Sequence, residues 1–143
     1  MKRAIGSAGL ALVVLLVASG AVAAKTRTAV SMDVPTTFDA APDLFLATGV
    51  AGCATGVVED GGAHIQFTAG PGVFAGDKVF ICDDSDSGML LRLNARFGAG
   101  GSVGTWAIVD GWGVLNGLRG SGSLTGEPID NGIFDQYTGW IVS

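Results

Sequence analysis

The sequence predicts an all-β protein, a single antiparallel up-and-down β-barrel of about eight strands behind an N-terminal signal peptide. Three observations lead to this prediction. No stretch keeps a helical period, short β-rich runs follow one another at turn-rich intervals, and Met89 to Phe97 alternates apolar and polar side chains. At least seven candidate strands in one domain must hide their edges, and closing the sheet on itself does so best.

The first 24 residues have the pattern of a secretory signal. Lys2 and Arg3 open it, Leu10–Val17 is apolar, and the small residues of Ala21–Ala24 suit a signal peptidase. An uncleaved anchor is the alternative, but the apolar run is shorter than the roughly 20 residues of a spanning helix. We therefore expect a signal peptide at 1–24, one barrel domain at 25–143, no integral membrane segment after signal removal, and a secreted, periplasmic or cell-envelope location.

Charge narrows the classes of partner. Without Lys2 and Arg3, the chain has 6 basic residues against 13 acidic ones, a formal charge of −7. An acidic protein with no basic cluster has no electrostatic means of holding nucleic acid or anionic lipid. We expect no nucleic-acid partner.

The two cysteines, Cys53 and Cys82, both lie in the exported part. In an oxidising compartment their expected state is a disulfide, which stabilises by roughly 3 to 4 kcal/mol on the chain-entropy estimate. Zinc is the alternative, but zinc needs about four ligands, and the chain adds only the single histidine His64.

The first half of the exported chain predicts short strands separated by breaks. Residues 28–39 carry Pro35, which cannot donate to a ladder, so we expect an edge strand or two short pieces. Leu44–Thr48 fits one helical turn or a short strand. Asp60-Gly61-Gly62 predicts a hairpin turn between strands at 54–59 and 63–68, because glycine supplies the positive φ of tight turns. Residues 69–77 are expected to form a loop before a strand at 78–82.

The strand from Met89 to Phe97 has the clearest pattern in the chain. It follows a polar turn at Asp83–Gly88, and Leu91 and Leu93 share its apolar face while Arg92 and Asn94 share the other. A loop at 98–101 leads into the next strand. The strand from Met89 to Phe97 should have one face in the core and one toward solvent.

A glycine-dense hairpin follows. Thr105–Val109 predicts a strand, Asp110–Gly113 a turn, and Leu118–Thr125 the returning strand. A loop at 127–132 then leads to the last strand, Ile133–Val142. The order of the strands along the chain suits an up-and-down connection.

This hairpin resembles that of the allene oxide cyclase and dirigent-type barrels, which carry a Gly-Gly-Thr/Ser-Gly-aromatic turn. The matching residues here are Asp110–Val114, followed by Gly117 and Gly120. Trp112 and Asp110 depart from the family's pattern, which has a small hydroxyl residue and a glycine at those places. The chain is also similar to small exported bacterial proteins with a Gly-Thr-Trp strand, a Leu-Arg-Gly-Ser-Gly strand and an Asp-x-Tyr-x-Gly strand, here Gly104–Trp106, Leu118–Gly122 and Asp135–Gly139.

The resemblance implies an eight-stranded antiparallel barrel, often assembled as a homotrimer, with a ligand cavity in the enzymes. The carboxylates of the plant enzymes have no match in this sequence, so the resemblance assigns no catalytic residue.

Metal and cofactor motifs are incomplete. In Asp83–Gly88, counting from Asp84, a calcium loop would need a ligand at the fifth position and a glutamate at the twelfth, where Gly88 and Ala95 stand. Gly111-x-Gly113 precedes no helix that could receive a phosphate. We expect no metal and no cofactor.

The candidate site residues are few. Asp135, with Tyr137, is the candidate catalytic residue, because alternation turns Ile133, Asp135, Tyr137 and Ile141 inward. A carboxylate inside a barrel needs a hydrogen-bond donor, and Tyr137 or Arg119 is the handiest one. The preferred alternative to catalysis is a structural role for Asp135, in which its hydrogen bond ties the last strand to its neighbour. Candidate ligand contacts are Trp106, Trp112, Trp140 and Arg119, although aromatic residues in β-proteins fill cores more often than they bind.

Three functional classes follow from this sequence. The preferred one is an exported non-catalytic barrel that binds a small apolar ligand or a macromolecular partner. The alternatives are a cyclase or isomerase that uses an interior carboxylate in a barrel cavity, and a structural envelope-associated protein. A cavity of several hundred Å³ would favour the first two, and a solidly packed barrel the third.

Overall fold

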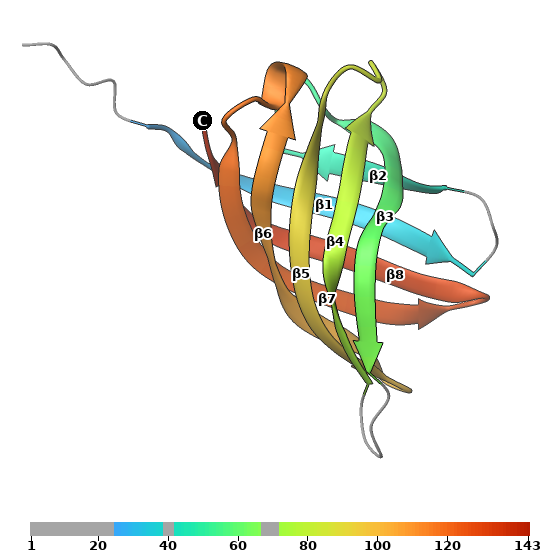
Figure 1. Cartoon of the computed structure of the whole chain (residues 1–143). Helices are drawn as coiled ribbons and strands as arrows, with labels where there is room; N and C mark the ends of the chain where they lie inside the picture. Colours follow the sequence, from blue (N-terminus) through green and yellow to red (C-terminus); the bar gives the residue numbers. More distant parts are fainter. Residues whose placement is uncertain (1–24, 39–41, 67–71) are drawn as a thin grey trace, which may run out of the picture.

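The computed structural model describes residues 25–38, 42–66 and 72–143, which form a closed barrel of eight antiparallel strands (Figure 1). Each strand pairs with the next along the chain, and the last closes on the first. The predicted up-and-down barrel is confirmed, while the predicted signal peptide at 1–24 lies outside the described residues. The strands are β1 (Arg27–Thr37), β2 (Asp43–Thr48), β3 (Thr55–Gln66), β4 (Gly72–Cys82), β5 (Gly88–Gly98), β6 (Gly101–Trp112), β7 (Arg119–Ile129) and β8 (Gly132–Val142).

β5 has the two faces that its sequence predicts. Met89 and Leu91 are fully buried and Leu93 is nearly so, whereas Arg92 and Asn94 are exposed. The predicted polar turn before β5 is also confirmed, because the Asp84 side chain accepts hydrogen bonds from the backbone N–H groups of residues 86 and 87 and from a buried serine hydroxyl. That turn satisfies its own backbone donors.

Asp60-Gly61-Gly62 is not a hairpin turn, so that prediction is wrong. β3 runs through these residues, and the register with β4 shifts between Asp60 and Gly62 as in a β-bulge. Gly62 has a φ of 113°, which glycine adopts without strain. The predicted loop at 69–77 is likewise wrong from Gly72 onward, because Gly72 pairs with β5 and residues 73–77 pair on both sides, with β3 and with β5. Residues 67–71 lie outside the described chain.

The predicted turn at Asp110–Gly113 begins too early. β6 continues to Trp112, and the chain reverses through a 3₁₀ turn, η1 (Gly113–Leu115), before β7. Gly113 has a φ of 62°, and the N–H of Val114 donates to the buried Ser87 hydroxyl at 3.1 Å. The reversal is thus fixed by a contact with the β4–β5 turn. The loop predicted at 127–132 is shorter than expected, since β7 extends to Ile129 and β8 starts at Gly132.

β1 is one continuous strand and not an edge, despite Pro35. It pairs with β8 over its whole length but with β2 only at Ser31–Asp33. Pro35 lies beyond this short second ladder, so its missing N–H breaks no bond to β2. Leu44–Thr48, which the sequence left undecided, belongs to β2.

One end of the barrel is packed solid. The Phe80 ring packs edge-on against Phe45 and Tyr137, with ring centroids 5.2 Å and 5.6 Å apart. The predicted disulfide, Cys53–Cys82, joins the segment after β2 to the end of β4 at this end, with 5.2 Å between the two Cα atoms. Among the described residues, the barrel is therefore closed here, and its cavity lies at the other end, next to the β5–β6 and β7–β8 turns.

Candidate ligand-binding site

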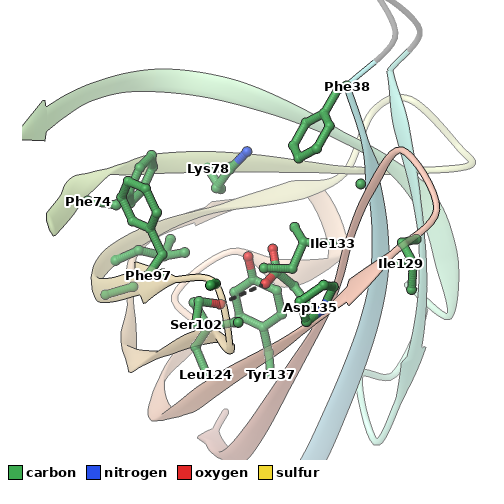
Figure 2. Close-up of a pocket in the computed structure, with 17 residues that line it drawn as sticks. Phe38, Phe74, Lys78, Phe97, Ser102, Leu124, Ile129, Ile133, Asp135 and Tyr137 are labelled. Atoms are coloured by element: carbon green, nitrogen blue, oxygen red, sulfur yellow. Dashed lines mark hydrogen bonds between the residues drawn. The ribbon is translucent and has the colours of Figure 1, made fainter. Parts of the chain in front are cut away.

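A cavity of about 530 Å³ occupies the open end of the barrel (Figure 2). Its wall comes from β4, β5, β7 and β8, from the β5–β6 turn and the start of β6, and from Phe38 just beyond β1. Most of the wall is apolar. Its larger apolar side chains are Phe38, Phe74, Leu93, Phe97, Leu124, Pro128, Ile129 and Ile133.

The predicted inward face of β8 is confirmed. Ile133, Asp135 and Tyr137 line the cavity, and Ile141 is buried further along the same face. The strand period of two therefore brings one carboxyl group and one phenol into an otherwise apolar space. Figure 2 shows both groups directed into the cavity.

The Asp135 carboxyl has a single hydrogen-bond donor among the described residues. Ser102 Oγ donates to Asp135 Oδ1 at 3.3 Å, which is long for a hydroxyl donor. Burial raises the Asp135 pKa to about 6, while Ser102 and the charge of Lys78 oppose this rise and the charge of Asp43 adds to it. Asp135 therefore changes charge close to neutral pH.

The donor expected from the sequence was Tyr137 or Arg119, and Ser102 takes that place. Arg119 lies at the packed end of β7, where its guanidinium donates to the Leu118 carbonyl at 2.9 Å. Ser102 was missed because it stands between the loop predicted at 98–101 and the strand predicted from Thr105. Ser102 on β6 and Asp135 on β8 both pair with Gly126 of β7, which lies between these two strands, and this shared partner brings them together.

Tyr137 forms the base of the cavity. Its side chain is only 1% exposed, its ring rests on Phe80, and its hydroxyl makes no hydrogen bond with any described residue while it points into the cavity. Burial, and after it the negative charges of Asp135, Asp43 and Asp60, raise the Tyr137 pKa well above its usual range. The phenol stays neutral, free to donate or accept.

Lys78 is a cavity residue that the sequence analysis did not single out. Its ammonium Nζ lies 2.5 Å from Asp60 Oδ1, and only 16% of its side chain is exposed. The signal was present in the alternation of β4, since Phe80 and Cys82 face the core and Lys78 shares their face. It was missed because Lys78 stood at the start of a strand predicted too short.

The three tryptophans lie away from the cavity. Trp106 is buried, and its indole N–H donates to the carbonyls of Ser123 and Thr138 at 3.1 Å and 3.3 Å. Trp112 lies beside Gly88 at the packed end, and Trp140 stacks under the Arg27 guanidinium 3.8 Å from its ring centre. The structure therefore gathers Asp135 and Tyr137 at the cavity, but not the four candidate ligand contacts.

Other site types find little support in the part of the chain that the structure describes. There, no group of three or more His, Cys, Asp or Glu side chains is placed to share a metal ion. In the same residues no helix has the length and apolar character needed to cross a membrane.

Comparisons with protein-family models, with curated proteins and with solved structures found no match to this chain. Of what the resemblance to allene oxide cyclase and dirigent-type barrels implies, the eight-stranded antiparallel closed barrel is confirmed.

Proposed function

We propose that this protein is an exported, non-catalytic barrel that binds one small, mostly apolar molecule in the cavity at the open end. The observation that carries the proposal is the cavity of about 530 Å³, apolar along its wall and polar at its base. Ligand sites in proteins have volumes of roughly 300 to 1,000 Å³ and combine apolar walls with a few placed polar groups. A barrel that served only as a scaffold would have no need of such a space.

The polar groups at the base of the cavity would fix the orientation of a bound ligand. Asp135, Ser102 and Tyr137 come from β6 and β8, so rigid strands hold them in place. A ligand that puts its polar end between Asp135 and Tyr137 supplies the hydrogen bond that the buried phenol lacks. Its apolar part then covers the wall formed by Leu93, Leu124 and the aromatic rings.

The proposal also includes where the protein is located and which protein family it is related to. The disulfide is typical of proteins from oxidising compartments, which supports export by the signal pattern at 1–24. Kinship with the allene oxide cyclase and dirigent-type barrels, and a homotrimer, are proposed from the glycine-rich hairpin. Native mass spectrometry of protein purified from culture medium would show both the oligomer mass and any retained ligand. A macromolecular partner in place of a small ligand would appear there as a heteromeric mass.

Binding of phenylnaphthylamine, a neutral fluorescent probe, tests the site. The wild-type protein should bind one probe per chain with a rise in fluorescence. Ala95→Trp adds a large side chain to the cavity wall and should abolish this binding, whereas Ala107→Trp puts the same side chain on the exposed face of β6 and should leave it unchanged. Both variants are checked for folding by circular dichroism. Equal binding by both variants would refute the proposed site.

A second candidate function rests on Asp135 and Tyr137. A carboxyl with a pKa of about 6 beside a neutral phenol suits general acid–base catalysis, as in a cyclase or isomerase. Incubating the protein with its retained ligand in deuterated water tests this. Deuterium incorporation that Asp135→Asn abolishes would favour the enzyme over the binding protein.

A further inference from the structure

The proposed ligand-binding cavity has an excess of negative charge at its polar end. Asp135 on β8 faces Lys78 on β4, Ser102 on β6 and the neutral Tyr137, and Asp43 on β2 and Asp60 on β3 act on the same region. The residues of β5 and β7 that line the cavity have no ionisable side chain, and no residue of β1 is among the lining residues. In this region the three carboxyl groups of Asp135, Asp43 and Asp60 outnumber the single ammonium group of Lys78.

The Lys78 ammonium group already forms an ion pair with Asp60. Lys78 Nζ lies 2.5 Å from Asp60 Oδ1, and the pair joins neighbouring strands in register. Asp135 keeps only the long bond from the Ser102 hydroxyl. A half-buried carboxylate without a close cation is costly, and a cation brought by the ligand would remove much of this cost.

The remaining polar atoms at this place also accept hydrogen bonds. The Tyr137 hydroxyl is directed into the cavity without a hydrogen bond to any described residue, and its oxygen offers lone pairs next to the Asp135 carboxyl. The Phe74 and Phe97 side chains belong to the apolar wall, which suits the apolar body of a ligand. A carboxylate-bearing ligand would meet the like charge of Asp135 at this position, and the nearest cation, Lys78, is already paired with Asp60.

We infer that the cavity selects a ligand with a protonated amine at its polar end and an apolar body, with Asp135 as the counterion and Tyr137 as a second acceptor. The inference rests on the proposed ligand-binding function and narrows its ligand class.

Three compounds with one skeleton test the inference: phenylbutylamine, phenylbutanol and phenylbutyrate, each competing with bound phenylnaphthylamine at pH 7.5. The amine should bind at least about tenfold more tightly than the carboxylate and several-fold more tightly than the alcohol. Asp135→Asn should remove the preference for the amine while leaving the affinity for the alcohol within about threefold. Glu59→Gln, which removes an exposed charge on β3, should change none of the three affinities.

Salt and pH separate a buried ion pair from general attraction to an acidic protein. High salt screens surface charges much more than buried ones, so the preference should persist in 0.5 M salt, a concentration at which the Debye length is only about 4 Å. Because the Asp135 pKa is about 6, the affinity for the amine should fall from pH 7.5 to pH 5. A preference that vanishes with salt, or that survives Asp135→Asn, would overturn the inference.

The outcomes also separate this inference from the proposed function. If phenylnaphthylamine binds and Ala95→Trp blocks it, but the carboxylate competes best or the amine and alcohol compete equally, the cavity binds ligands and the charge inference is wrong. If phenylnaphthylamine does not bind, the proposed function itself fails.

Discussion

Replacing Asp135 by asparagine should stabilise the protein at pH 8. The ordinary aspartate pKa of 3.8 rises to about 6 in the folded protein, mainly through burial. At about 1.4 kcal/mol for each pH unit, this difference amounts to about 3 kcal/mol. The folded state holds the proton more tightly than the unfolded state, so the free energy of unfolding falls as pH rises from about 4 to about 6 and is level above that.

Asparagine has nearly the same shape and no charge, so it avoids this loss. It gives up the long hydrogen bond from Ser102 to a charged acceptor and the attraction of the carboxylate to Lys78. We therefore expect Asp135→Asn to raise the free energy of unfolding by about 2 kcal/mol at pH 8 and by almost nothing at pH 4. For a domain of this size the gain at pH 8 corresponds to roughly 8 °C in melting temperature.

Urea denaturation at pH 4, 5, 6 and 8 measures the effect directly. Glu59→Gln, at an exposed position on β3, is the matched loss of one carboxylate and should show no comparable gain. If Asp135→Asn is less stable than the wild type at pH 8, the carboxylate makes folded-state interactions worth more than its burial costs. The explanation of the raised pKa by burial would then be wrong.

Three further predictions concern the barrel. Leu93→Asp should prevent soluble folding, because Leu93 is buried in the core. Arg92→Ser should lower the free energy of unfolding by no more than about 1 kcal/mol, because it removes only an exposed ion pair. Equal expression of both variants in soluble form would contradict the register of β5. Unreduced protein treated with a thiol reagent should show no adduct by mass spectrometry, since Cys53 and Cys82 are bonded, and two adducts would contradict this. Gly139→Ala should cost about 1 to 3 kcal/mol in urea denaturation, because its new methyl group would lie 2.3 Å from a carbonyl oxygen of β7, and an unchanged midpoint would refute this packing.

Much of the barrel could be predicted because its strands carry strong alternation. Leu91 and Leu93 identify the core face of β5 from single-residue steps, and the lack of helical period excludes other fold classes. The wrong prediction of a hairpin turn at Asp60-Gly61-Gly62 arose because glycine is compatible with more than one backbone conformation. Gly61-Gly62 suits a hairpin turn and a bulge equally well in isolation, and only pairing with β4 on one continuous ladder selects the bulge.

The candidate site was predictable only in part. Alternation in β8 places Asp135 and Tyr137 inside, and it does so from the sequence alone. Ser102 and Lys78 join them through the closure of the barrel, which brings β4 and β6 to the same space as β8. Such contacts depend on the register between strands of the closed barrel, which decides which residues lie at the same level along its axis. Alternation within a single strand does not predict that register.

The central claim is that a small, mostly apolar molecule occupies the cavity at the open end. Nuclear Overhauser effects between bound phenylnaphthylamine and labelled methyl groups of the protein test it most directly. Contacts should appear with Leu93, Leu124 and Ile133, which line the cavity, and not with Leu115 or Leu118, which are buried near the packed end. Contacts with Leu115 or Leu118, or only with exposed methyl groups on the outer face, would contradict the claim.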